Sequence, residues 1–292
     1  MTGATGLVGS ALLPALTDAG HEAVGLRRGG ADAGAAPSWD PSRGRVAAAG
    51  PLDAVVHLAG ENIAGGRWSA ARKARIRDSR VEGTAALCRG LAALDPRPAT
   101  LVAASAVGFY GDRGDERLDE SSPAGSGFLA DVCQEWEAAA APARDAGIRV
   151  VHLRIGIVLT PAGGALGQML LPFKLGVGGV IGSGRQFMSW IGLDDLTVAL
   201  LHAAVTEGLE GPVNAVAPNP ASNTEFTKTL GRVLGRPTIL PVPAFGARLA
   251  FGEMADHLLL GGARVEPTRL QETGFEFGYP DLGGALRHLL GA

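Results

Sequence analysis

Three glycines near the start of the chain have the spacing of a loop that holds the phosphates of a nucleotide. Gly3, Gly6 and Gly9 recur at every third residue, and an apolar stretch with helical spacing follows at once. Glycine allows a tight turn and close backbone approach to a pyrophosphate, and the N-terminus of the next helix faces the negative charge. We predict that the site for this dinucleotide includes Gly3, Thr5, Gly6, Leu7, Val8 and Gly9.

Two arginines indicate which dinucleotide is bound. Arg27 and Arg28 stand about 20 residues beyond the glycine turn, where this kind of site contacts the adenosine ribose. The next acidic residue is Asp32. A carboxylate at this point favours NAD, whereas guanidinium groups suit the 2′-phosphate of NADP. We therefore predict NADP(H) as the cofactor.

A third part of the site is predicted where an apolar run ends in His57-Leu58-Ala59-Gly60. Small residues at such a strand end allow the adenine and ribose to lie across it, so Leu58, Ala59 and Gly60 are predicted cofactor contacts. His57 is interpreted as a packed histidine. The six histidines are scattered and no His/Cys cluster has ligand spacing, so no metal site is predicted.

The elements that would position these residues alternate between strand and helix. Apolar runs predict strands at residues 21–28, 53–59, 100–105 and 149–153, with helices at 7–19, 69–94 and 127–146 between them. This alternation predicts an α/β fold, a Rossmann-type doubly wound parallel sheet. Only Met1 and Thr2 precede the glycine turn, so the first strand of the sheet is truncated, and we expect further apolar residues upstream in the natural gene.

Beyond residue 153 the pattern loosens and predicts a smaller C-terminal α/β lobe that binds substrate. A further strand of the main sheet is expected at 211–217 and a short strand at 238–242. Helices are expected at 168–174, 193–206, 223–234, 244–251, 267–273 and 281–290, with Ser222 or Asn223 as the N-cap of the helix at 223–234. The nucleotide-binding domain is assigned residues 1–160 plus 192–217. The substrate lobe is assigned 161–191 plus 218–292.

Composition excludes several other classes of protein. The 292 residues carry 26 Lys+Arg against 29 Asp+Glu, a net charge of −3 that gives no global attraction to nucleic acid or anionic lipid. Two cysteines exclude a disulfide scaffold, and no apolar run is long enough to span a membrane. We expect a cytoplasmic protein without nucleic-acid or membrane partners, whose substrate is a small molecule and which could pair as a homodimer.

With these residues in place, the chain resembles the extended short-chain dehydrogenase/reductase superfamily, and within it the atypical epimerase-family group called SDR39U1-like. The matching stretches cover nearly the whole chain in order and include TGATGLVG (2–9), HLAGENIAGGRW (57–68), SAVGFYG (105–111) and IGSGRQFMSWI (181–191). The resemblance implies an NADP-binding Rossmann domain with a small C-terminal lobe. It also implies that Arg80 and Val158 contact the cofactor.

The catalytic residues of that superfamily are only partly present. Typical members use a Ser or Thr after a strand, then a Tyr and a Lys four residues apart on the next helix, where the tyrosine transfers a proton. Ser105 fits the first position. If Glu137 is the glutamate that typically follows, Leu129 and Cys133 occupy the Tyr and Lys positions, and neither can do that acid–base work.

Three alternatives follow from the missing pair. In the first, another side chain supplies the proton; Tyr110, five residues after Ser105, is the best candidate, and Asp112, Cys133 and Glu137 are weaker ones. In the second, water supplies the proton in a reduction or epimerase-like reaction. In the third, the protein binds NADP without turnover, as a regulatory or redox-sensing module. Tyr110 can also be a packing residue. A Gly-rich loop could place Arg185, Gln186 and Trp190 along a substrate pocket or simply join the lobes. The basic residues between 67 and 80 are interpreted as a solvated helix.

Overall fold

The computed structural model describes residues 1–29, 37–48 and 50–292. A parallel sheet lies at its centre, in the order β11-β7-β5-β4. These strands are β4 (Ala54–His57), β5 (Thr100–Ala106), β7 (Arg149–Ile155) and β11 (Gly211–Ala215). β5 is buried along both faces until its last residue, as the continuous apolar run predicts for a central parallel strand.

Met1 and Thr2 continue this sheet beyond β4, in the place where the sequence requires a first strand. Thr2 donates its backbone N–H to Val56, Leu58 donates to Thr2, and Leu26 donates to Met1. The next elements outward are β1 (Arg27–Arg28), which pairs in parallel with β2 (Ser38–Asp40), and β3 (Arg45–Ala47), which pairs antiparallel with β2. The predicted strand at 21–28 is thus reduced to its last two residues.

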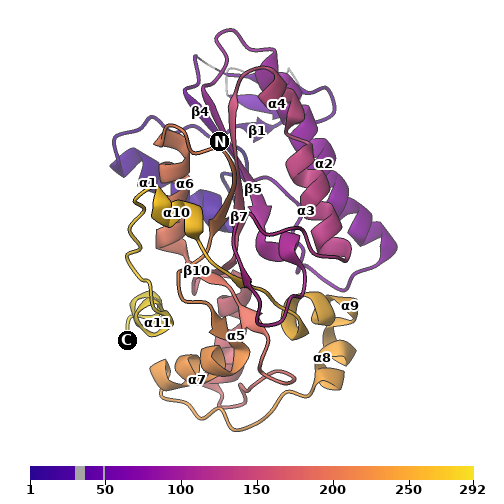
Figure 1. Cartoon of the computed structure of the whole chain (residues 1–292), viewed down its shortest axis with the longest axis vertical. Coiled ribbons are helices and arrows are strands. Elements are labelled where there is room, and N and C mark those ends of the chain that lie inside the picture. The colour runs from indigo at the N-terminus through magenta and orange to yellow at the C-terminus, as the bar shows by residue number, and fades with distance from the viewer. Residues whose placement is uncertain (30–36, 49) are drawn as a thin grey trace.

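Helices cover both faces of the sheet (Figure 1). One face carries α2 (Ala70–Ala92), α3 (Phe128–Ala138) and α4 (Ala141–Asp145), and the other carries α1 (Leu7–Asp18) and α6 (Leu193–Val205). The single helix predicted at 127–146 is divided into α3 and α4 because Pro142 lacks an N–H and its ring obstructs the preceding turn. This two-sided cover makes the fold a Rossmann-type doubly wound sheet.

A smaller lobe has a core of its own, which includes Leu166, Phe173, Trp190, Phe226 and Leu286. Its elements are β8 (Ile157–Leu159), α5 (Gly164–Lys174), β9 (Phe187–Met188), β10 (Trp190–Gly192), β12 (Ala221–Ser222), α7 (Asn223–Val233) and α11 (Leu282–Leu290). α8 (Ala244–Phe251), α9 (Glu253–Ala255) and a π-helical turn η2 (Asp256–Leu260) lie beside it. Ser222 is the N-cap of α7 and forms a capping box with Glu225.

Two predictions for the C-terminal part differ from the structure. Residues 238–242 form no strand, because only Val242 makes a bridge, to Ile181, and the prolines at 237 and 241 lack backbone donors. Leu270 and Phe275, assigned to the small lobe, pack into the core of the main sheet. Leu270 lies on α10 (Thr268–Glu272) and Phe275 follows this helix. Both come after β13 (Arg264–Val265), which pairs with β6 (Arg117–Leu118). None of the described helices is long and apolar enough to cross a membrane.

Candidate dinucleotide site

The glycine turn has the geometry that its sequence predicts. Gly3 has a φ of +69°, and a Cβ there would lie 2.8 Å from the carbonyl carbon of Leu58. A Cβ on Gly9 would lie 2.2 Å from the Gly3 oxygen, so only glycine allows α1 to approach the turn this closely. Gly3 therefore brings the turn directly against the end of β4.

The N-terminus of α1 is left free for an anion. Its N-cap is Gly6, which has no side chain to accept the first N–H groups, and its first turn contains no acidic residue. The loop before α5 forms a second wall, since Cβ atoms on Gly163 and Gly164 would each lie 3.3 Å from the Leu7 side chain. Exposed Thr5 and half-buried Val8 complete the turn. Free amides and the positive end of the helix dipole at a bare turn fit a pyrophosphate.

Arg27 and Arg28 lie beyond this turn at the end of β1, and both side chains are exposed. The Arg28 guanidinium carbon lies 6.0 Å from the centre of the Trp39 ring. Within the described ranges, neither arginine pairs with a carboxylate, and Asp32 lies outside them. Two solvated guanidinium groups at this sheet edge suit a phosphate on a ribose.

Arg80 reaches the end of β4 from α2. A Cβ on Gly60 would lie 3.5 Å from its guanidinium carbon, and its Nη1 donates to Glu61 O at 3.1 Å and to Ile76 O at 3.0 Å. The same group lies 5.0 Å from the Trp136 ring centre, and burial lowers the pKa of Arg80 from its ordinary value. Half-buried Leu58 and Ala59 precede exposed Gly60, so a fixed cation stands beside the predicted strand-end contacts.

Val158, which the resemblance places near the cofactor, lies on β8 and is half-buried. Its carbonyl oxygen is 3.7 Å from where a Cβ on Gly164 would be. Val158 therefore borders the same loop that touches Leu7. The glycine turn and the start of α1 thus lie between the end of β4 and the loop that follows β8.

His57 is a packed residue, as interpreted from the sequence. Its Nδ1 is 2.7 Å from Thr2 Oγ1, its Nε2 is 3.0 Å from Thr84 Oγ1, and the side chain is fully buried. Burial lowers the pKa of His57 to about 4. A neutral imidazole between two hydroxyls joins the first strand, β4 and α2. Across the described part of the chain, no three His, Cys, Asp or Glu residues gather as a metal site would require.

Ser105 is buried and bonded to a carboxylate. Its hydroxyl donates to Glu137 Oε1 at 2.7 Å, and Glu137 binds Arg154 through both oxygens, at 2.8 and 2.9 Å. The Arg154 guanidinium lies 3.5 Å from the centre of the Phe109 ring. Burial alone would lower the pKa of Arg154, but its bonds to Glu137 outweigh this and raise it. The arrangement is a buried ion pair between β7 and α3.

Tyr110 ends the short helix η1 (Val107–Tyr110) and is fully buried. Its hydroxyl lies 2.8 Å from Asn214 Oδ1 and 2.9 Å from Asp119 O, and accepts from Arg154 Nη1 at 3.0 Å. Burial raises the pKa of Tyr110. Both hydroxyls predicted to be catalytic are thus buried and engaged by the protein. These bonds favour the alternative of Tyr110 as a packing residue, and the catalytic role of Ser105 and Tyr110 stays a prediction.

Leu129 and Cys133 face the end of β5 from α3, where the superfamily pattern expects tyrosine and lysine. A Cβ on Gly108 would lie 3.4 Å from Leu129 Cβ and 3.8 Å from Cys133 Sγ. Burial raises the pKa of Cys133 to about 12, so the thiol stays neutral. Neither Leu129 nor Cys133 carries a charge there. Arg80 and Glu137 nevertheless lie close enough to act on Cys133 electrostatically.

The predicted substrate residues do not share one surface. Trp190 is fully buried in the core of the small lobe and donates its indole N–H to Asn219 O. Buried Gln186 donates to Ile181 O at 3.0 Å and to Leu259 O at 2.8 Å, which ties its loop to η2. Arg185 is exposed. For Gln186 and Trp190 the structure favours the alternative of a joining loop, because their polar atoms serve backbone carbonyls.

Contacts that join the loop after β4 and the first turn of α2 to α8, α9 and η2 were not predicted from the sequence. Arg67 Nη2 donates to Leu249 O at 2.6 Å, Lys73 Nζ lies 2.8 Å from Glu253 Oε1, and Trp68 stacks on His257 with ring centres 5.5 Å apart. We call this set of contacts the clasp. Its partners are about 180 residues apart in sequence, so no local pattern signals it.

The basic residues of α2 serve ion pairs. Arg77 lies 2.6 Å from Glu135, and Arg72 and Arg75 lie about 4 Å from Glu61. Carboxylates thus balance much of the positive charge. This pairing agrees with the interpretation of a solvated helix rather than a nucleic-acid surface.

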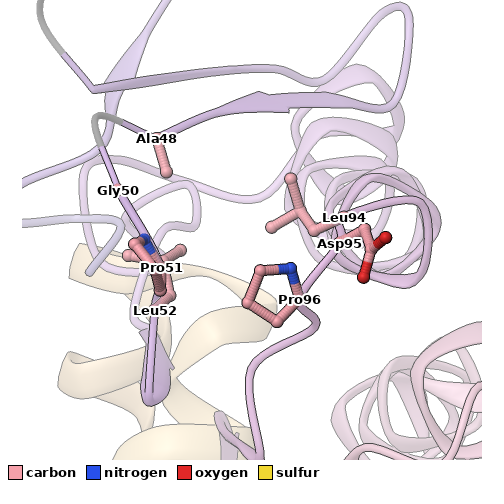
Figure 2. A pocket seen from close by; sticks show the side chains of 7 residues that line it. All are labelled: Ala48, Gly50, Pro51, Leu52, Leu94, Asp95 and Pro96. Carbon is pink, nitrogen blue, oxygen red and sulfur yellow. The ribbon is translucent and has the colours of Figure 1, made fainter.

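Two cavities lie at the opposite edge of the sheet. The one in Figure 2 has a volume of about 330 Å³ and is bounded by Ala48 and the segments 50–52 and 94–96, which precede β4 and β5. The second, about 640 Å³, lies before β7 and β11 and includes Arg149 and Glu210. Ligands of open α/β sheets bind at the carboxyl ends of the strands, so neither cavity belongs to the glycine turn.

Known proteins match this chain from end to end. The model of the NAD dependent epimerase/dehydratase family matches residues 1–215, and a domain of unknown function, DUF1731, matches residues 242–289. The chain belongs to the NAD-dependent epimerase/dehydratase family. An epimerase family protein of Mycobacterium bovis, Mb2239, is 46% identical over 98% of this chain and 95% of its own.

Human epimerase family protein SDR39U1 is also similar, at 38% identity over 99% of this chain and 98% of its own. Its crystal structure with NADPH superposes with a TM-score of 0.90 over 99% of this chain and 97% of that one. A nucleoside-diphosphate sugar epimerase from Corynebacterium glutamicum has a TM-score of 0.78 and 39% identity, over 99% of this chain and 57% of that one. These matches confirm the SDR39U1-like resemblance and the Rossmann-type fold.

Proposed function

We propose that the protein binds NADP(H) at the glycine turn and transfers hydride to or from a small-molecule substrate. The observation that carries the proposal is the bare N-terminus of α1 behind Gly3, Gly6 and Gly9, with exposed Arg27 and Arg28 at the next strand end. The NADPH-bound human relative supports the choice of cofactor.

In this proposal the residues divide by the part of the cofactor they hold. The first-turn amides of α1 receive the pyrophosphate, Arg27 and Arg28 receive the 2′-phosphate, and Leu58, Ala59 and Gly60 lie along the adenosine side beside Arg80. Val158 borders the nicotinamide end. The nicotinamide supplies or accepts the hydride when bound.

The proton needed for a carbonyl reduction comes from water in this proposal. Ser105 and Tyr110 bond within the protein, and Leu129 and Cys133 offer no charged acid or base. Reduction of a carbonyl consumes one hydride and one proton and yields an alcohol and NADP⁺. In this proposal uncharged Leu129 and Cys133 border the substrate, and the proton is exchanged with water on its solvent side.

A second candidate is a regulatory protein that binds NADP(H) without turnover. The same pair on α3 favours it, since Leu129 and Cys133 stand where typical members have the tyrosine and lysine. The two candidates share the cofactor site and differ only in whether NADPH is consumed.

Titration of the purified protein with NADPH and NADH tests the cofactor site. We expect NADPH to bind more tightly, and Arg27→Ala/Arg28→Ala to remove most of the preference, by about tenfold or more for the loss of charge-assisted phosphate bonds. Arg43→Ala/Arg45→Ala is the matched control, because both side chains are exposed on the neighbouring hairpin. Equal binding of the two nucleotides would refute the role of Arg27 and Arg28.

NADPH oxidation with a panel of small ketones, aldehydes and nucleotide sugars then separates the two candidates. Turnover that persists in Ser105→Ala and disappears with the cofactor-site variant supports the oxidoreductase with water as proton source. Tight NADPH binding without oxidation across the panel supports the regulator.

A further inference from the structure

The exposed apolar residues of this protein are concentrated at one end of the small lobe. Ten large apolar side chains are exposed among the described residues, and eight of them lie on α5, α8 or the loops beside them. The most exposed are Leu171 on α5, Leu175 at its C-cap, Ile239 in the loop after α7, and Phe245 and Leu249 on α8, with exposed fractions between 67% and 82%. These five residues are called the end patch.

The segments that carry the end patch are neighbours in space. Val242 donates to Val180 O at 2.8 Å and Gly182 donates to Val242 O at 2.9 Å, so the loop after α5 runs beside the loop after α7. A Cβ on Gly182 would lie 4.0 Å from Ala244 Cβ, at the start of α8. Figure 1 shows α5, α7 and α8 at the end of the molecule farthest from α4.

The segments that carry the end patch contain basic residues and no acidic residue. Residues 164–192 and 226–252 together contain six Lys or Arg and no Asp or Glu, in a chain whose net charge is −3. All six basic residues, Lys174, Arg185, Lys228, Arg232, Arg236 and Arg248, are exposed. Arg248 pairs with Asp256 at 2.8 Å, and the other five have no ion pair within the part of the chain that the structure describes. These segments therefore carry a local excess of positive charge, bordered by exposed Glu225 and Glu253, in a chain that is negative as a whole.

We propose that this end of the small lobe docks peripherally on an anionic lipid surface. Exposed apolar side chains interspersed with Lys and Arg are the composition that binds the headgroup region of such a surface. The charge argues against a second copy, because a symmetric pair through the end patch would place like charges opposite each other. No helix is required to cross the bilayer.

Vesicle flotation of the full chain tests the proposal. The probes are vesicles of phosphatidylcholine alone and of phosphatidylcholine with about one third phosphatidylglycerol. We expect binding to the anionic vesicles only, with a fall of about tenfold or more between low and high salt because exposed charges are screened.

Three variants separate the contributions. Phe245→Ser/Leu249→Ser removes apolar contacts, and Lys174→Glu/Arg236→Glu reverses charge; each is expected to weaken vesicle binding about tenfold or more. Val198→Ser/Val205→Ser, on α6 and likewise exposed at 53% and 56%, is the matched control and keeps binding. Thermal unfolding shows that each variant is folded.

Absence of binding to anionic vesicles at low salt would overturn the proposal. Equal weakening in the α6 control would do the same. Light scattering tests the other occupant: a concentration-dependent dimer that Phe245→Ser/Leu249→Ser abolishes would assign the end patch to a second copy instead.

Discussion

The buried ion pair between Glu137 and Arg154 makes the sharpest stability prediction. In Glu137→Gln the side chain keeps its size and an oxygen for the Ser105 hydroxyl, but the Arg154 charge loses its carboxylate. The two side chains are only 13% and 4% exposed, so water replaces little of what is lost. Removal of one partner of a buried pair costs about 3–5 kcal/mol.

The lower end of that range applies here, about 3 kcal/mol, because Arg154 keeps its bond to Tyr110 and its position over Phe109. This is a large part of a total stability of roughly 5–15 kcal/mol. Denaturant unfolding monitored by tryptophan fluorescence measures it as a lower midpoint with an unchanged slope.

Glu135→Gln is the matched control on the same helix. Glu135 is 42% exposed and pairs with an exposed arginine, so we expect little change in the midpoint. If the two variants lose similar stability, the argument that a buried charge pair fixes β7 to α3 is wrong. If Glu137→Gln stays folded but loses NADPH binding, the network acts on the cofactor site rather than on stability.

Three further outcomes are expected. Tyr110→Phe lowers the free energy of unfolding by about 1–3 kcal/mol, since Asn214 and Arg154 lose a buried partner, while NADPH affinity is unchanged in the titration. Gly6→Ala weakens NADPH binding with little loss of melting temperature, whereas Gly9→Ala, whose Cβ would lie 2.2 Å from Gly3 O, also lowers the melting temperature. Burial lowers the pKa of both His57 and His152 to about 4, below the unfolded value of about 6.5. The contribution of each histidine to the free energy of unfolding is therefore full above pH 6.5 and falls by roughly 3 kcal/mol as the pH drops toward 4. Urea unfolding at several pH values measures this loss, and we expect a shallower pH dependence in His152→Asn.

Local patterns were sufficient for much of the fold, whereas the residues that they assign to the cofactor stay a prediction. The apolar runs marked β4, β5 and β7 because a parallel strand covered on both faces must be apolar along its length. The three glycines marked the turn at α1 because only glycine tolerates those distances to Leu58 and Gly3. Pro142, which divides α3 from α4, was visible in the sequence, but an apolar helical pattern on both sides of it suggested one helix.

The sequence by itself thus determined the strand–helix alternation of the Rossmann-type fold, the glycine turn and the positions of Arg27 and Arg28, since each is marked by residues close together in the chain. Only the tertiary structure decided that Ser105 and Tyr110 are buried, because their partners Glu137, Arg154 and Asn214 come from α3, β7 and β11. It likewise decided the place of Trp190 and the clasp between Lys73 and Glu253. A residue type shows what chemistry is available, but burial and distant partners decide whether a ligand can reach it.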